Sequence, residues 1–166
     1  MRALLILLFA CAMAAGCEPH DRRPGTWLSG EVVTAPVADW AFSNAYPEVF
    51  VETRTWYRVP HSVTTTLVTD AGTLYVPSLY YDGGDFPAER YWNRNIARDP
   101  AVRVKIGEKI YPRHAELVTD PAERAVVLAA FAAKYDRWRD MLRGGEPERP
   151  HIILLRLDPR SAEGDL

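Results

Sequence analysis

The sequence predicts a single domain of the α+β class in which β-structure predominates, with six or seven strands, one short helix and one long helix. Three features of the chain indicate this class. Apolar and polar residues alternate over most of the chain after Trp27. A hairpin signal, Asp-Ala-Gly, lies at 70–72. Between 121 and 143, one apolar stripe recurs at helical spacing.

The predicted strands are short segments that are rich in β-branched and aromatic residues or that alternate apolar and basic side chains. The segment 151–157 is apolar on both faces at its centre, so we expect an interior strand there. Pro112 interrupts the segment 110–118 and predicts an edge or a bulge. The other predicted strands are 49–55, 62–68, 73–76 and 102–106.

The long helix is predicted over about 121–143. Asp120 is a suitable N-cap, Pro121 suits the first helical position, and Glu123 completes a capping box. The apolar stripe of this helix is expected to pack against the sheet rather than to hold a cofactor. Its members are Val127, Phe131, Tyr135, Trp138 and Leu142.

The short helix is predicted over about 88–97. Asp99-Pro100 must end it, because proline disfavours α geometry in the residue before it. A strand follows at once, so this joint is expected to fix the helix against the sheet edge. Trp92 and Asn95 share one face of the helix. This pair would either cradle a planar heterocycle or cap a neighbouring backbone and fill a corner of the core.

Three arginines lie four residues apart on the short helix. Such spacing places them on one face, which indicates a solvated surface, an anion site, or a contact with anionic lipid headgroups. The three are Arg90, Arg94 and Arg98.

The first residues of the chain predict export. One cationic residue, an apolar run and small residues form a signal peptide over 1–16, too short for a transmembrane helix. The end of this segment resembles a bacterial lipobox, which predicts cleavage before Cys17 and a diacylglycerol on its thiol. The alternative is an ordinary signal peptide that leaves Cys17 as a free thiol. We therefore expect a lipidated tether over 17–26, one domain over 27–166, and a bacterial cell-envelope lipoprotein that faces the periplasm.

Charge and histidine placement argue against two classes of function. Cleavage before Cys17 removes Arg2, one of the 20 basic residues, and none of the 22 acidic ones, which leaves a net charge of −3. Such a balance does not indicate nucleic-acid binding. The histidines are scattered without ligand spacing, so no metal site is expected. They are His20, His61, His114 and His151.

One motif resembles a known family. The pattern W-x-x-N-I-x-x-x-P-x-V-x-V is similar to the signature of the split β-barrel family of deazaflavin-dependent nitroreductases, and more distantly to pyridoxamine-phosphate-oxidase-like flavoproteins. The hairpin 64–78 and the helix entry 118–125 also resemble that family, and the likeness covers roughly 49–157. The motif is carried by Trp92, Asn95, Ile96, Pro100, Val102 and Val104.

The resemblance implies a split barrel that binds FMN or a deazaflavin, often near a dimer interface, which allows a homodimer. The reduced cofactor would pass a hydride to a quinone-like or nitro-aromatic acceptor, and no catalytic residue is assigned. By position, the hairpin residues would hold the anionic tail of the cofactor, and the others would lie near its ring. The implied cofactor-binding residues are Arg54, Arg58, Ser62, Thr64, Ser78, Trp92 and Asn95.

A second function stays open beside this one. The turn over 54–60 has fewer charges than in the family and no glycine, and the chain is predicted to be exported. Both features favour a non-catalytic envelope lipoprotein that acts as a ligand-binding or protein-interaction module. Haem-like or lipid-derived small molecules are alternative ligands.

Overall fold

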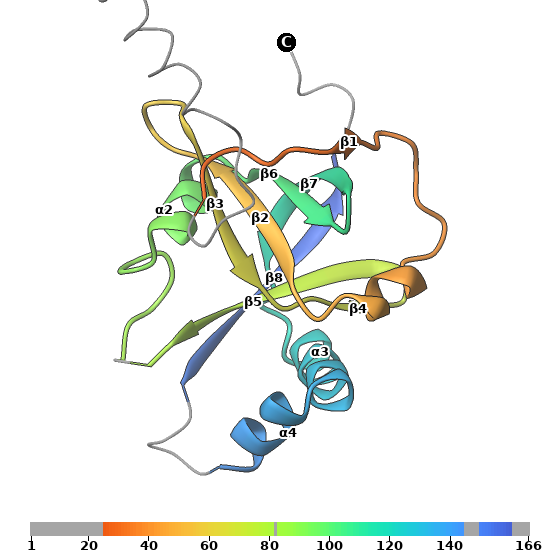
Figure 1. The fold of residues 1–166 in the computed structure, drawn as a ribbon. Helices are drawn as coiled ribbons and strands as arrows, with labels where there is room; N and C mark the ends of the chain where they lie inside the picture. The colour runs from red at the N-terminus through yellow and green to blue at the C-terminus, as the bar shows by residue number, and fades with distance from the viewer. Residues whose placement is uncertain (1–24, 82, 145–149, 161–166) are drawn as a thin grey trace, which may run out of the picture.

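The computed structural model describes residues 25–81, 83–144 and 150–160. They form one β-sheet that curls around a core, with helices outside it (Figure 1). Of the helices in these ranges, none is long and apolar enough to cross a membrane. The elements are β1 (Glu31–Val32), η1 (Ala41–Ala45), β2 (Val49–Arg54), β3 (Pro60–Thr65), β4 (Val68–Asp70), β5 (Thr73–Tyr80), α2 (Tyr91–Arg98), β6 (Ala101–Ile106), β7 (Lys109–Leu117), α3 (Pro121–Lys134), α4 (Asp136–Arg143) and β8 (His151–Pro159).

The sheet is the split barrel that the sequence predicted. Its strand order is β3-β2-β6-β7-β8-β5-β4 with antiparallel neighbours, and β1 adds to β7 in parallel. The sheet curls until β3, at one end of this order, lies against β5, near the other end. Thr65 Oγ1 of β3 donates to the carbonyl oxygen of Pro77 in β5 at 3.2 Å. No backbone ladder joins these two strands in the part of the chain that the structure describes, so the barrel is open along this line.

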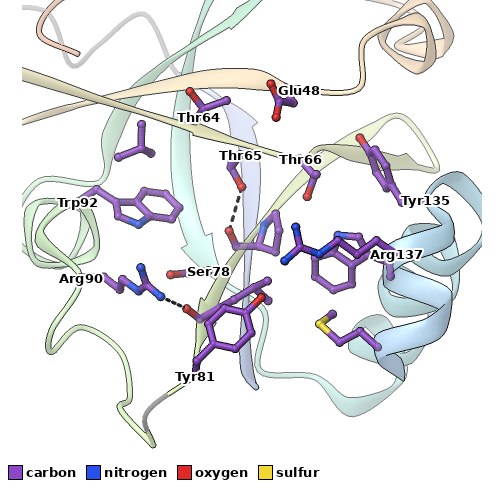
Figure 2. Close-up of a pocket in the computed structure, with 15 residues that line it drawn as sticks. Glu48, Thr64, Thr65, Thr66, Ser78, Tyr81, Arg90, Trp92, Tyr135 and Arg137 are labelled. Atoms are coloured by element: carbon purple, nitrogen blue, oxygen red, sulfur yellow. Dashed lines mark hydrogen bonds between the residues drawn. The ribbon is translucent and has the colours of Figure 1, made fainter. Parts of the chain in front are cut away.

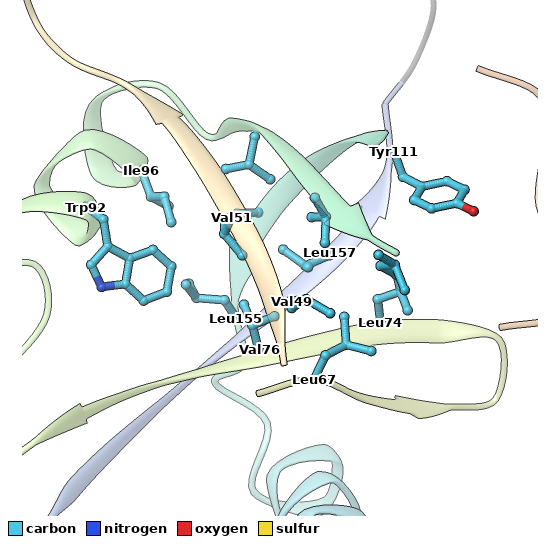
Figure 3. Close-up of a cluster of buried hydrophobic side chains, with 14 of the residues drawn as sticks. Val49, Val51, Leu67, Leu74, Val76, Trp92, Ile96, Tyr111, Leu155 and Leu157 are labelled. Carbon is cyan, nitrogen blue, oxygen red and sulfur yellow. The ribbon is translucent and has the colours of Figure 1, made fainter. Parts of the chain in front are cut away.

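The main core fills the barrel (Figure 3). Valines and leucines of β2, β5, β6 and β8 meet there, and Trp92 and Ile96 of α2 close one side. Val49, Val51 and Val104 are completely buried. Since period-two alternation sends every second side chain inward, these strands bury one face each in this core.

A second core lies between the outer face of the barrel and helices α3 and α4. Phe131 and Val127 of α3 and Trp138 of α4 pack on Ile152 and Leu154 of β8. Strand β8 is therefore buried on both faces and pairs with both β5 and β7, which confirms the interior strand expected at 151–157.

The predicted long helix is two helices, which corrects the single helix expected over 121–143. Tyr135, between α3 and α4, has extended geometry with φ −128° and ψ 121°. Its hydroxyl donates to the carbonyl oxygen of Leu67 at 3.0 Å, and the Leu67 amide donates to the same hydroxyl at 3.3 Å. This contact also accounts for a second correction, because the strand expected over 62–68 breaks at Thr66–Leu67 into β3 and β4. With β1 counted, the described sheet has eight strands rather than six or seven.

The ends of the helices differ from expectation in two further details. Asp120 caps α3 as predicted, and its carboxylate accepts from the amides of Ala122 and Glu123. The Glu123 side chain, however, accepts from the Tyr75 hydroxyl at 3.0 Å rather than closing a capping box. The short helix begins at Tyr91, three residues later than expected.

Pro112 lies in an interior strand, although the sequence predicted an edge or a bulge. Along the same side of β7, β1 pairs with Lys109 and Ile110, and β8 pairs from Arg113 onward. Pro112 falls between these two partners. No described strand pairs with it on this side, so its missing backbone N–H leaves no hydrogen bond unmade there.

The described chain begins on the barrel. The backbone of Gly25 pairs with Ser62 in β3 through two hydrogen bonds of 3.0 and 3.1 Å. The predicted signal peptide and the predicted lipidation site at Cys17 lie outside the described residues.

Candidate functional site

A groove of about 500 Å³ follows the open line of the barrel between β3 and β5 (Figure 2). The end of β3 and the second half of β5 form its floor. The start of α2 lies on one side of it, and α4 with Tyr135 lies on the other. The labelled residues around it are Glu48, Thr64, Thr65, Thr66, Ser78, Tyr81, Arg90, Trp92, Tyr135 and Arg137.

The two long walls of the groove are aromatic or apolar. Trp92 is only 7% exposed, since it is also part of the main core, and it lines the groove from α2. Trp138 and Met141 of α4 line the opposite side. Helix α4 is held there because the Trp138 ring stacks on Phe131 of α3 with the ring centres 4.3 Å apart. A flat ligand could therefore lie between two supported apolar surfaces.

Hydroxyl groups from both strands lie along the floor. Ser78 is 3% exposed, and its oxygen accepts a hydrogen bond of 2.7 Å from the Asn93 amide group. The Thr64 hydroxyl is buried and has no hydrogen-bond partner among the described residues. Burying such a group without a partner is unfavourable by about 1–3 kcal/mol.

Positive charge stands on both sides of the groove. Arg90 Nη2 donates to the carbonyl oxygen of Leu79 at 2.5 Å, and its guanidinium lies 5.7 Å from the centre of the Tyr80 ring. Arg137 is exposed on α4, and no described carboxylate forms an ion pair with it. Burial raises the pKa of Tyr135 above its ordinary value, so that hydroxyl stays protonated and bonded to Leu67.

The residues implied by the family resemblance do not all meet at this groove. Thr64, Ser78 and Trp92 line it. Arg54 and Arg58 instead line a separate depression of about 440 Å³, together with Arg103 and Arg160, and this depression shares no lining residue with the groove. Ser62 is completely buried in β3, under the Gly25 bridge.

Asn95 lies inside the fold rather than on either hollow. Its amide group donates to Thr53 Oγ1 at 3.0 Å, and Thr53 Oγ1 donates to the carbonyl oxygen of His61 at 3.1 Å. Asn95 and Thr53 are each 2% exposed. Asn95 therefore ties α2 to β2 and β3, which is the structural alternative that the sequence left open for this residue.

Several residues that line the groove or support it from behind were not among those expected to bind the cofactor. Arg90 was considered only as one of three arginines that form a solvated surface, an anion site or a contact with lipid headgroups, and not as a cofactor-binding residue. Asn93 is completely buried, and its amide group donates hydrogen bonds to Ser78 and Tyr80. Its position in the sequence gives no sign that it, rather than Asn95, would lie next to the groove. Arg137 and Met141 reach the groove only because the chain turns at Tyr135. No group of three histidine, cysteine, aspartate or glutamate residues in the described ranges could hold a metal ion.

Solved structures with a similar backbone share the pyridoxamine-phosphate-oxidase-like split barrel. A conserved hypothetical protein from Mycobacterium tuberculosis is 15% identical, with a TM-score of 0.54 over 80% of this chain and 87% of that one. A candidate pyridoxamine 5′-phosphate oxidase from Listeria innocua is 18% identical, with a TM-score of 0.52 over 73% and 90%. The heme storage protein HutZ from Vibrio cholerae is 16% identical, with a TM-score of 0.52 over 73% and 87%.

These similarities establish the fold and leave the family open. No protein-family model matches the chain, and a search of curated proteins found no match.

Proposed function

We propose that this protein binds a flavin-type cofactor, FMN or a deazaflavin, in the groove between β3 and β5. One observation carries the proposal: the groove combines the flat wall of Trp92 with hydroxyls on its floor and a guanidinium on each side. A phosphorylated flavin needs an apolar surface for its rings, hydrogen-bonding groups for its polar edge and a cation for its phosphate. The volume of about 500 Å³ falls within the roughly 300–1,000 Å³ of ordinary ligand sites.

The residues present fit such a group. The unpartnered Thr64 hydroxyl is buried, so it would reach the edge of a ring system or a ribityl chain by changing its rotamer. Arg137 is exposed and has no described carboxylate partner, so it is available to a phosphate. Arg90 is held by the Leu79 carbonyl and would bind an anion with its remaining N–H groups.

An oxidoreductase is the activity that this arrangement supports. A bound flavin supplies the hydride chemistry, and the protein supplies binding and orientation. Trp92 would fix the height of the ring above the floor, because its own position is set by the core. The described lining has one carboxylate, Glu48, and no histidine, so the chain offers few groups for proton transfer. We expect acceptors that a flavin reduces directly, such as quinone-like or nitro-aromatic compounds.

A second candidate is a non-catalytic binding module with heme as its ligand. Met141 and Tyr81 both line the groove, and thioether and phenolate groups are known axial ligands of heme iron. The heme storage protein HutZ has the same fold. The candidate pyridoxamine 5′-phosphate oxidase is named for a substrate that, like FMN and heme, is planar and acidic. The similarity to these two structures therefore supports a planar anionic ligand, but it does not distinguish FMN from heme.

The sequence features at the N-terminus support a location at the cell envelope. We propose that Cys17 carries the lipid, that the domain faces the periplasm, and that the protein acts there as a monomer or a homodimer. Metabolic labelling with a fatty acid tests the first point, since Cys17→Ser should abolish the label.

The first test of function is spectroscopic. The protein is purified from its host membranes and mixed in turn with FMN, a deazaflavin and heme, and absorbance is recorded after gel filtration. A flavin band that elutes with the protein supports the proposal, and a Soret band alone supports the heme-binding alternative. Protein that elutes without any of the three would overturn both.

The variant Trp92→Phe tests whether the indole of Trp92 contacts the flavin ring, without unfolding the protein. It keeps an aromatic side chain in the core, so the protein should stay folded, while a bound flavin should fluoresce more strongly because the indole no longer quenches it. Arg143→Gln on α4 is the matched surface control, because Arg143 lies outside the groove lining.

A further inference from the structure

We infer that the tip of the β2–β3 hairpin and the adjoining face of α2 form a surface that docks on an anionic lipid membrane. This aromatic–arginine surface lies outside the groove and is independent of the proposed cofactor. It consists of Trp56, Tyr57, Val59, Tyr91, Arg54, Arg58, Arg94 and Arg98.

The aromatic part of the surface is unusually exposed. Trp56 is 74% exposed, Tyr57 is 50% and Val59 is 44%. The rings of Trp56 and Tyr57 meet edge to face, with their centres 5.1 Å apart. Side chains with an apolar body and a polar tip are enriched where a membrane meets water, since both parts are satisfied there.

The tip is presented in a fixed shape. The Thr55 amide donates to the Val59 carbonyl oxygen at 3.1 Å, and the Arg58 amide donates to the Thr55 carbonyl oxygen at 2.9 Å. Arg58 has a positive φ of 64°, so this turn depends on those bonds. Burying Trp56 would therefore need a large change in the backbone of this turn, so its ring stays exposed.

The basic part of the surface has no described acidic partner. All four arginines are exposed, and none forms an ion pair with a described carboxylate. The Arg94 guanidinium lies 5.2 Å from the centre of the Tyr91 ring, and Arg98 donates to the backbone oxygen of Arg54. Asp99 at the border is engaged by the Ala101 amide at 3.1 Å. Four positive charges thus gather in a chain whose net charge is −2.

The position of the N-terminal chain identifies the membrane as the partner. Gly25 pairs with Ser62 on β3, a strand of the same hairpin. Cys17, the predicted lipidation site, is eight residues earlier, which is at most roughly 29 Å of extended chain. A lipid at Cys17 would keep Gly25, and with it this hairpin, close to the bilayer, so even a weak affinity for lipid headgroups would dock the surface.

The test measures the contact between Trp56 and lipid in the anchored protein. The full chain is purified from its membranes and reconstituted into phosphatidylcholine vesicles with or without phosphatidylglycerol, and the acyl chains are brominated to quench nearby indoles. The chain has five tryptophans, so the signal of Trp56 is the difference between wild type and Trp56→Phe. We expect strong quenching of that component in the anionic vesicles and little in the neutral ones.

Charge variants give the decisive comparison. Each arginine near an anionic surface changes the ratio of docked to free protein about fivefold, so Arg58→Gln with Arg94→Gln should lower it about 25-fold. Arg143→Gln changes charge on α4, at the far end of the molecule from the hairpin (Figure 1), and should leave quenching unchanged. The proposal is overturned if the Trp56 component is unquenched in anionic vesicles, or if Trp56→Ser instead dissolves a dimer that buries this surface.

Discussion

Replacing Asn95 by alanine is expected to weaken the fold and to leave ligand binding intact in the protein that remains folded. The Asn95 amide donates to Thr53 Oγ1 at 3.0 Å, and both residues are 2% exposed. The substitution removes one buried hydrogen bond, worth about 1 kcal/mol, and leaves a small cavity. Thr53 still donates to the His61 carbonyl oxygen. Arg98 loses the 3.4 Å hydrogen bond that it donates to Asn95 Oδ1, but it is exposed and still donates to the backbone oxygen of Arg54. The free energy of unfolding should fall by about 1–3 kcal/mol in total.

Urea denaturation followed by circular dichroism measures this loss. The midpoint should fall while the slope with denaturant stays constant, since the surface exposed on unfolding hardly changes. A double-mutant cycle with Thr53→Val isolates the pair, and we expect a coupling energy of about 1 kcal/mol. A coupling energy near zero, together with a flavin affinity that falls in Asn95→Ala alone, would refute the structural role and return Asn95 to the cofactor site.

Three further perturbations test other parts of the structure. Phe131→Ala should lower the free energy of unfolding by about 3–5 kcal/mol, because Phe131 is completely buried and stacks on Trp138; a loss below about 1 kcal/mol in urea denaturation would contradict that packing. Asn93→Leu should lower it by about 2 kcal/mol, because the amide group of Asn93 donates to Ser78 at 2.7 Å and to Tyr80 at 2.6 Å; Ser78→Ala should then cost less in the variant than in wild type. Burial and the Glu123 contact raise the pKa of Tyr75 from 10.0 to about 12. The stabilisation from its protonated form is therefore complete below about pH 10 and is lost as pH rises toward about 12, and Tyr75→Phe should remove that part of the pH dependence of unfolding.

The fold class could be predicted because its evidence is local. Alternating residues in 49–55 and 102–106 and the cap at Asp120 each depend on neighbours in sequence, and these elements form close to where they were expected. The break at Tyr135 could not be predicted, because the apolar stripe continues across it. Its cause is a hydrogen bond to Leu67, which lies 68 residues earlier in the chain.

The candidate site could be predicted only in part for the same physical reason. Thr64, Ser78 and Trp92 were expected near a ligand, and they meet where β3 and β5 approach without pairing. Arg137 and Met141 enter the groove only because the turn at Tyr135 redirects α4. Arg54 and Arg58 line the separate depression at the β2–β3 hairpin. The sequence position of a residue at the end of a strand does not predict which depression its side chain will line.

The affinity of Arg137→Gln for FMN and for riboflavin tests the central claim most directly. Riboflavin has the same ring as FMN without the phosphate, so it senses the Trp92 wall and the hydroxyl floor alone. A charge-assisted hydrogen bond from Arg137 to the phosphate predicts a loss of about ten- to a hundredfold in FMN affinity and no change for riboflavin. Equal losses for both ligands, or unchanged FMN binding in the variant, would contradict the placement of the phosphate beside α4 and with it the orientation of the cofactor in this groove.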